Sequence, residues 1–381
     1  MRRACLFLFL LALVCPVDSA QAQDWSLEST LFQSFYAASN PFLVTGGGTP
    51  LYGSVTSPDL VLKRKGEDSL LDLDTRVDQN IFNQSTYDST DLHLKTDTSI
   101  RQPLWAASLG GGVDLDTTRT SELVTYGRTP VSSSHTGLRL LPEIAYTLTP
   151  QDRLGLSSKI DSSNYANAAF TDYALFAVTP VYTHQVTPLS TLSLRFDLQH
   201  FEALGNAKNK IDTLAPLIGW EGALLPTLTA HLAAGGQARR ASLGGKRETP
   251  VEWDAVWDSG LSWKGLNDRL DVTSVRAETP YGNGTSALQT SIGLVETHSF
   301  TPLFDFRVGG SYAEGTYPVS VTGSLSTLAM GQTGLAWHVT DSLALDLHYQ
   351  YRAAKMVNIP GTAEDHMIGL QLEITKPLRL N

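Results

Sequence analysis

The sequence is almost free of cysteine. Its 381 residues include two, Cys5 and Cys15, and both lie in the first 22 positions. The rest of the chain can therefore form neither disulfides nor thiolate metal sites, which argues against a small disulfide-stapled scaffold. A closed, hydrogen-bonded sheet would stabilise an exported chain without either.

Long apolar runs are also missing. After the N-terminal region, no run reaches the roughly 20 apolar residues that a transmembrane helix needs. Two classes remain, a soluble protein and a membrane β-barrel, because a barrel crosses the membrane with short alternating strands. The periodicity of the sequence has to decide between them.

Positive charge is scarce. The sequence has 28 Lys and Arg residues against 38 Asp and Glu residues, for a formal net charge of −10. Removing Arg2, Arg3 and Asp18 with the first 22 residues leaves 26 basic and 37 acidic residues and a net charge of −11. No basic run is present, so we expect no nucleic-acid partner.

The N-terminus has the three parts of a secretory signal. Arg2 and Arg3 give a positive start, residues 6–14 form an apolar stretch of suitable length, and Ala20-Gln21-Ala22 fits the small-x-small cleavage rule. We therefore predict a signal peptide over residues 1–22 and a single domain over residues 23–381.

Many segments alternate apolar and polar residues with a period of two. In the clearest, Leu343, Leu345 and Leu347 alternate with Ala344, Asp346 and His348. Similar segments begin near residues 71, 92, 192 and 304. A soluble β-sandwich also alternates. Segments of about ten residues that recur at a pitch of about twenty, with hardly a helical stretch between them, are typical of an outer-membrane barrel.

The connections between these segments are of two kinds, which alternate along the chain. Short breaks with Pro, Gly or Asp turn chemistry lie at residues 65–68, 102–103, 149–152, 187–188, 225–227, 265–268, 301–302 and 340–342. Longer polar connections lie at residues 37–53, 84–90, 117–136, 162–171, 202–210, 238–250, 280–285, 314–324 and 353–364.

This alternation predicts an all-β protein, a single transmembrane antiparallel up-and-down β-barrel with short periplasmic turns and long extracellular loops. The count gives about 18 strands, with 16 as the alternative, and an even number returns both termini to the periplasm. We expect the protein in the cell outer membrane of a Gram-negative bacterium, in contact with outer-membrane lipid.

The aromatic residues and the C-terminus support this topology. Five Trp residues fall toward the short-turn ends and seven Tyr residues toward the long-loop ends, as two interfacial girdles would require. They are Trp25, Trp105, Trp220, Trp263 and Trp337, and Tyr36, Tyr87, Tyr165, Tyr173, Tyr281, Tyr312 and Tyr351. Gly369, Leu372 and Ile374 match the last-strand signal that the barrel-assembly machinery binds, although the chain then runs on past Lys376 to Asn381 without a terminal aromatic residue.

If the apolar parity faces lipid, the other parity lines the interior. A Lys or Arg facing lipid near the midplane costs roughly 2–4 kcal/mol, so the charged residues belong inside. The candidate lumen-lining residues are Asp72, Asp74, Arg76, Asp78, Lys95, Asp97, Arg101, Arg195, Asp197, Asp305, Arg307, Asp346 and Arg352. Their mixed signs indicate a polar path without a strong preference for anions or cations. A charge network that only braces the wall is the alternative interpretation.

Signals of catalysis and of metal binding are weak. Gly260-Leu261-Ser262-Trp263-Lys264 lacks the last glycine of a nucleophile elbow, and the nine histidines are scattered singly. The pairs Asp72-x-Asp74 and Asp114-x-Asp116 lack the glycine and glutamate of a calcium loop. We expect no catalytic residue, no metal and no cofactor. A lipid-modifying barrel enzyme, with a Ser-His pair assembled near His200 or His348, is the least favoured alternative.

Ser39-Asn40-Pro41, the strand from Ser54 to Leu62, the strand from Leu70 to Asp78 and the Thr149-Pro150 turn follow one another in a characteristic order. This order resembles the outer-membrane β-barrel porins that are encoded in exopolysaccharide gene clusters, and the resemblance covers nearly all of residues 25–381. It implies a passage for a secreted polysaccharide, or a channel for another polar solute, that works with periplasmic export partners. It supplies no catalytic residue. A barrel plugged by its loops, with a structural or surface-interaction role, is the alternative.

Overall fold

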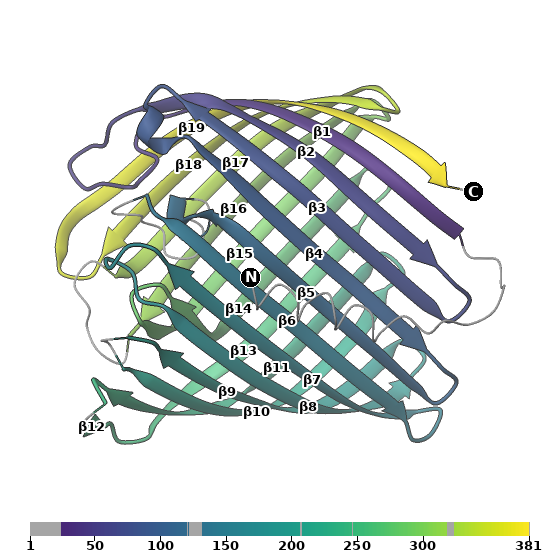
Figure 1. Cartoon of the computed structure of the whole chain (residues 1–381). Helices are drawn as coiled ribbons and strands as arrows, with labels where there is room; N and C mark the ends of the chain where they lie inside the picture. The colour runs from purple at the N-terminus through teal and green to yellow at the C-terminus, as the bar shows by residue number, and fades with distance from the viewer. Residues whose placement is uncertain are drawn as a thin grey trace.

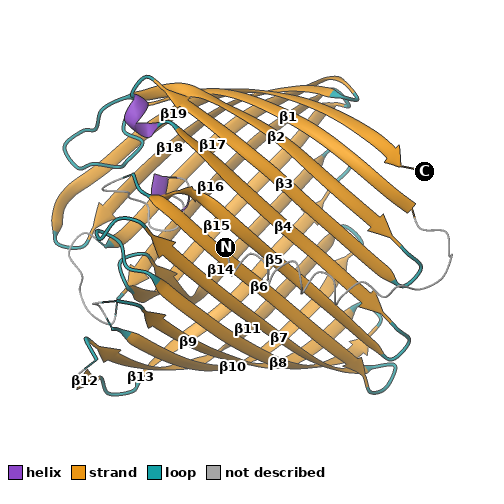
Figure 2. Cartoon of the chain, in the orientation of Figure 1, coloured by secondary structure: helices purple, strands orange, loops and turns teal. Residues whose placement is uncertain are grey.

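The computed structural model describes residues 24–119, 121, 132–205, 208–245, 247–317 and 324–380. Nearly all of this chain is β-strand, with a short 3₁₀ helix, η1 (Ser85–Tyr87), in one connection and a short helical segment at residues 118–119 in another (Figure 2). No helix within these ranges is long and apolar enough to cross a membrane. The signal peptide predicted for residues 1–22 lies outside the described residues.

The strands follow one another along the whole chain. They are β1 (Asp24–Ala38), β2 (Leu51–Lys65), β3 (Ser69–Phe82), β4 (Ser89–Arg101), β5 (Trp105–Thr117), β6 (Ser134–Thr147), β7 (Asp152–Tyr165), β8 (Tyr173–Thr187), β9 (Ser190–Ala203), β10 (Lys210–Leu225), β11 (Leu228–Leu243), β12 (Arg247–Glu248), β13 (Glu252–Lys264), β14 (Asp268–Tyr281), β15 (Thr285–Thr301), β16 (Phe304–Thr316), β17 (Leu325–Thr340), β18 (Leu343–Met356) and β19 (Ile359–Leu380).

Eighteen of these strands form a closed barrel. Each wall strand pairs antiparallel with its neighbours in the chain, and β1 pairs with β19 to close the sheet. The remaining strand, β12, has two residues and pairs only with the end of β11. The strands run obliquely around the barrel, and the described chain begins and ends at the same rim (Figure 1). The predicted 18-strand up-and-down barrel is confirmed.

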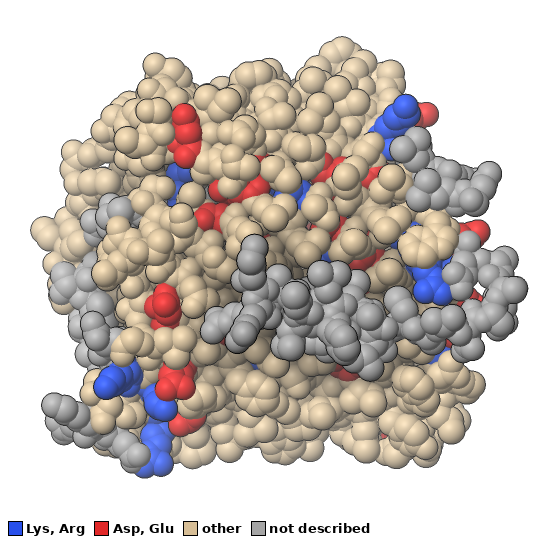
Figure 3. All heavy atoms as spheres, in the orientation of Figure 1, with Lys and Arg blue, Asp and Glu red and all other residues tan. Residues whose placement is uncertain are grey.

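The two-residue alternation explains why these segments form the wall. One parity of each strand carries exposed apolar side chains, such as Phe35, Leu347 and Ile218, the last of which is 71% exposed. Such exposure would be unfavourable in water and is what a hydrocarbon surrounding requires. On the face seen in Figure 3, most of the surface belongs to uncharged residues, and charged atoms appear near the two ends and in a diagonal band between them.

The opposite parity faces the interior. Arg195 on β9 approaches Asp258 on β13 to 3.6 Å, although β10 and β11 lie between these strands. Two side chains can meet across intervening strands only on the concave side of a curved sheet, because they diverge on the convex side. The fold is therefore that of an outer-membrane β-barrel, with an apolar outer face and a polar inner face.

Among the described residues, the predicted connections are confirmed as two kinds, with two exceptions, while most of the loop predicted at 117–136 and residues 318–323 lie outside the described ranges. The loop expected at residues 280–285 is reduced to residues 282–284, and the loop expected at 353–364 is a two-residue turn at 357–358. Both predictions were wrong because the strands continue beyond the membrane-spanning part. Residues 281–288 are almost all buried, and Ala354, Met356 and Ala363 pack against the interior residue Leu43. The strand extensions at both places therefore pack inside the barrel mouth instead of forming long loops.

Three of the predicted girdle Trp residues lie at strand ends, whereas Tyr173 and Tyr281 are 8% and 1% exposed and pack in buried clusters, so the girdle prediction is wrong for these two. Trp25 and Trp105 lie in the first two residues of β1 and β5, and Trp263 is the next-to-last residue of β13. Trp253, which the girdle prediction did not include, is 71% exposed at the loop end of β13. The last strand continues to Leu380, which pairs with Trp25. The residues after Ile374 therefore extend the closing strand instead of ending it.

Candidate functional site: the barrel interior

The interior charges of β2 to β5 form the first of several ion-pair groups. Arg76 binds Asp78 at 3.0 Å, and Asp72 lies 3.8 Å from Lys63. Asp74 is directly opposite Lys95, and Asp72 is directly opposite Asp97. Seven of the predicted lumen residues thus come from two neighbouring strands, β3 and β4. Six of them share one patch of the inner face, and the seventh, Arg101, ends β4 at the short-turn rim.

The second group lies on β9 and β13. Arg195 contacts Asp197 at 3.3 Å and Asp258 at 3.6 Å, and Asp258 also lies 3.4 Å from His231. Thr179 donates a hydrogen bond of 3.0 Å to Asp197. The guanidinium group therefore joins β9 to β13 across the interior and has a carboxylate partner on each of these strands.

The third group lies on β16 to β18. Arg307 forms an ion pair with Asp346, and Asp346 also accepts a hydrogen bond of 3.2 Å from His348. Asp305 on β16 accepts hydrogen bonds from Ser299 at 2.7 Å and from His338 at 3.0 Å. In this group, Arg307, Asp346 and Asp305 each have an opposite charge or a hydrogen-bond partner beside them.

The fourth group fixes the first external loop inside the barrel mouth. Arg352 donates to Asp365 at 2.6 Å and to the backbone carbonyl oxygen of Pro41 at 3.1 Å. Asp365, which is fully buried, also accepts a hydrogen bond of 2.7 Å from the backbone N–H of Asn40. Leu43 packs beside this pair in an apolar cluster with residues of β17 to β19. The loop over residues 39–50 is thus fastened to the inner wall.

The β14–β15 hairpin leaves the wall and enters the lumen. The pairing of β13 with β14 stops at Trp257 and Arg276, although both strands continue for five more residues toward the loop end. Beyond this fork, Leu288 of β15 packs in a buried cluster whose other members lie on β10, β11 and β13: Ala215, Leu217, Ala233 and Val256. Since three wall strands separate β10 from β15, this contact crosses the interior.

Polar contacts hold the hairpin in this position. The carboxylate of Glu278 accepts a hydrogen bond of 3.2 Å from Gln237 and lies 3.6 Å from Arg239, and it also binds the hydroxyl group of Ser286. Gln237 and Arg239 belong to β11, with β13 in between. Glu278 lies on the parity that faces lipid before the fork. Beyond the fork, this face of the hairpin turns inward and packs on the inner face of β11.

Three external loops touch the hairpin tip from other sides. Thr171 donates its backbone N–H to the carbonyl oxygen of Gly282 at 2.8 Å, and Asn209 donates its side chain to that of Gly284 at 2.9 Å. Asn283 binds the hydroxyl group of Ser324 at 2.9 Å. Gly284 has φ +78°, and an added Cβ would lie 2.9 Å from Thr171, so a larger residue would be strained there. These contacts narrow the barrel at its loop end.

A cavity of about 450 Å³ lies beneath the base of this hairpin. Its polar lining includes Thr179, Arg195, Asp197 and Gln199 from β8 and β9, with Asp258 from β13 and residues 275–278 of β14. Ala215, Leu217 and Val256 supply an apolar floor. The volume falls within the range of roughly 300–1,000 Å³ typical of small-molecule sites.

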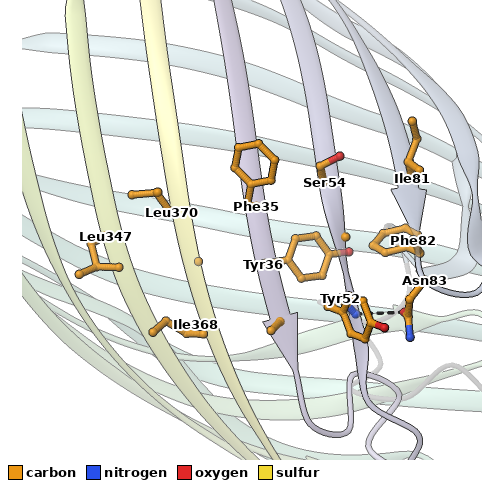
Figure 4. A pocket seen from close by; sticks show the side chains of 13 residues that line it. Phe35, Tyr36, Tyr52, Ser54, Ile81, Phe82, Asn83, Leu347, Ile368 and Leu370 are labelled. Atoms are coloured by element: carbon orange, nitrogen blue, oxygen red, sulfur yellow. Dashed lines mark hydrogen bonds between the residues drawn. The ribbon is translucent and has the colours of Figure 1, made fainter.

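The outer face carries a different kind of hollow. A shallow groove of about 660 Å³ crosses β18, β19, β1, β2 and β3 near the loop end (Figure 4). Its walls are apolar, with Phe35, Ile81, Leu347, Ile368 and Leu370 on the lipid-facing parity. At one edge the backbone N–H of Tyr52 donates to the side chain of Asn83 at 3.1 Å. The groove belongs to the lipid-facing surface and does not reach the polar groups of the interior site.

The histidines, scattered in the sequence, are paired in the structure. Eight of the nine contact an aspartate within 4 Å. His135 binds Asp116 at 2.7 Å from the directly opposite position on the neighbouring strand, and His93 binds Asp114 in the same way. Within the described ranges, no group of three or more His, Cys, Asp or Glu residues could hold a metal ion. Each acidic residue of the Asp114-x-Asp116 pair is engaged by a different histidine.

Comparison with known proteins agrees with the fold. The chain is similar in structure to OccK2 (OpdF) of Pseudomonas aeruginosa, with a TM-score of 0.52 and 11% identity over 94% of this chain and 100% of that one. It is also similar to OccAB4 of Acinetobacter baumannii, with a TM-score of 0.51 and 11% identity over 95% of this chain and 100% of that one. These neighbours are outer-membrane porins of the Occ/Opd group. No protein-family model matches the sequence, and no curated protein matches it either.

The fold and the inner face together define an outer-membrane β-barrel of porin architecture. All thirteen predicted residues lie on wall strands, and all but Arg101 lie in the groups described above. The pairs Arg195–Asp258 and Arg307–Asp346 join strands that are not neighbours. Sequence reasoning missed Gln199, Asp258, Glu278 and Arg239. Alternation alone would place Asp258 and Gln199 on the inner parity, but no sequence signal marks the fork at which Glu278 turns toward β11.

Proposed function

We propose that the protein is an outer-membrane channel for polar solutes and that the permeating class is saccharide, in its finer form a polysaccharide leaving the cell. One observation carries the proposal. The 18-strand barrel has an inner face on which Arg195, Arg307 and Arg352 are each compensated by a nearby carboxylate. A wall without surplus charge gives ions little advantage, while its hydroxyl, amide and carboxylate groups can exchange hydrogen bonds with a hydrated, uncharged chain.

Periplasmic export partners and the barrel-assembly machinery belong to this proposal as expected partners. The short turns at the periplasmic rim, such as residues 66–68 and 102–104, would be the surface that export partners meet. Outer-membrane lipid would cover the apolar parity of the wall.

A plugged barrel with a structural role is the second candidate. The observation that favours it is the inward β14–β15 hairpin, which packs through Leu288 against the opposite wall and is capped by three loops. If this packing closes the lumen completely, loops displayed outside the cell would be the functional surface.

Planar-bilayer conductance of the purified mature protein separates the two candidates. A channel gives discrete current steps, whereas the absence of steps at every voltage would reject the channel in favour of the plugged barrel. The finer proposal is tested by deleting the gene and measuring secreted polysaccharide. We expect secretion to fall, and unchanged secretion together with normal conductance would leave a channel for smaller solutes.

A further inference from the structure

We infer that the cavity beneath the β14–β15 hairpin is a binding site for a neutral saccharide unit. This inference rests on the proposed channel function and names the position in the lumen at which the solute is recognised. The site comprises Arg195, Asp197, Gln199 and Asp258, with Ala215 and Val256 on its apolar floor.

Two hydrogen-bond donors of the lining residues have no acceptor. The Nε2 group of Gln199 and the Nε group of Arg276 are shielded from solvent, and neither has a hydrogen-bond acceptor among the described residues. Leaving a buried donor unsatisfied costs about 1–3 kcal/mol, so a ligand gains if the Gln199 amide rotates toward one of its acceptor oxygens.

The same cavity also presents acceptors. Asp197 and Asp258 share the guanidinium group of Arg195, and two carboxylates offer more lone pairs than this one cation can occupy. A suitable ligand must therefore donate as well as accept hydrogen bonds within a few ångströms. Hydroxyl groups do both, and neighbouring hydroxyls on one ring present them at fixed spacing.

Charge and shape favour a neutral ring over an ion. The lining has two guanidinium groups, Arg195 and Arg276, and three carboxylates, Asp197, Asp258 and Glu278, the last of which also lies 3.6 Å from Arg239. An anion would meet guanidinium groups that already have carboxylate partners, and a cation would have to displace an arginine that already bridges β9 and β13. The floor formed by Ala215, Leu217 and Val256 is apolar, as contact with the C–H face of a pyranose requires.

The probe for this site is maltotriose, titrated into the detergent-solubilised full-length mature protein by calorimetry and added to the channel in planar bilayers. The key variant is Gln199→Leu, which keeps the side-chain size and removes the unsatisfied donor without changing charge. We expect maltotriose to bind the wild type and to interrupt its current, and the affinity of Gln199→Leu to fall by roughly threefold to tenfold, the value of one hydrogen bond.

Two further variants keep the test decisive. Gln185→Leu makes the same substitution near the C-terminal end of β8, outside the cavity, and should bind maltotriose like the wild type. Ala177→Leu fills the cavity without removing a polar group and should weaken binding. It replaces Gln199→Leu as the test if that variant does not fold.

The outcomes separate this inference from the proposed channel. A conducting barrel that neither binds maltotriose nor is blocked by it overturns the site and leaves the channel standing. Binding that is lost in Gln199→Leu but occurs without any conductance supports the site and rejects the channel. Equal affinity in Gln199→Leu, or tighter binding of glucuronate than of maltotriose, overturns the neutral-saccharide site.

Discussion

The inward hairpin makes the most specific prediction, because one apolar side chain supports its docking. Leu288 is 1% exposed and packs against Ala215, Leu217, Ala233 and Val256 on the opposite wall. Truncating a buried leucine to alanine typically costs about 2–5 kcal/mol. Since each 1.4 kcal/mol is a factor of ten, Leu288→Ala should raise the population with a released hairpin by a factor of roughly 30 to a few thousand.

A released hairpin widens the barrel at its loop end, so single-channel recordings of Leu288→Ala should show a larger conductance level or longer time in it. The matched control is Leu294→Ala, on the same strand and the same parity but lipid-facing and 41% exposed. This control should leave the conductance levels unchanged.

The hairpin contacts can be checked independently of current. Amide hydrogen exchange at residues 281–288 should become faster in Leu288→Ala and stay slow in Leu294→Ala. If both variants fold, and both give wild-type conductance and wild-type exchange at the hairpin, then Leu288 does not hold the hairpin in the lumen and the reasoning is refuted.

Two further predictions concern the mouth and the wall. Arg352→Met leaves the buried Asp365 without its cation, which typically costs about 3–5 kcal/mol. Proteolysis within residues 39–50 should therefore become faster, and unchanged cleavage would show that the pair does not fasten this loop. Ile218→Arg places a cation in lipid at the middle of β10 and should destabilise folding into vesicles by about 2–4 kcal/mol in urea titrations. The control Gln350→Arg, on the inner parity of β18, should cost far less, and equal costs would contradict the assignment of faces.

The architecture could be predicted because the surroundings of each strand determine its own sequence pattern, independently of the other strands. Lipid outside and polar groups inside impose alternation on every pass of the chain, and turn residues mark where the passes end. Counting such segments in the sequence alone gives about eighteen strands, which is the number that forms the closed barrel. The cross-strand pairs were out of reach, because pairing His135 with Asp116 requires the register between two strands, and alternation leaves that register open by steps of two residues.

The fork at Trp257 and Arg276 was out of reach for a related reason. Leu288, Ile292 and Leu294 share one parity and one apolar character, so a sequence pattern assigns all three to lipid. In the structure, Ile292 and Leu294 are exposed and Leu288 is buried against the inner wall. What distinguishes them is the end of the β13–β14 pairing at Arg276, which is opposite Thr290, because Leu288 lies on the loop side of this point and Ile292 and Leu294 do not. The position of this fork depends on contacts with β10, β11 and three loops at once.

The hairpin also constrains how a polymer could pass. A saccharide bound in the cavity would lie directly under residues 275–278, at the base of the hairpin, and the docked tip covers the way toward the loop end. A continuous chain must have the tip moved aside throughout its passage. If the barrel exports polysaccharide, we therefore expect Leu288 to leave its cluster while the chain passes. The conductance of Leu288→Ala thus tests the docking of the hairpin and also bears on polymer passage. A hairpin that is released when this one contact is weakened is one that a traversing chain could hold aside.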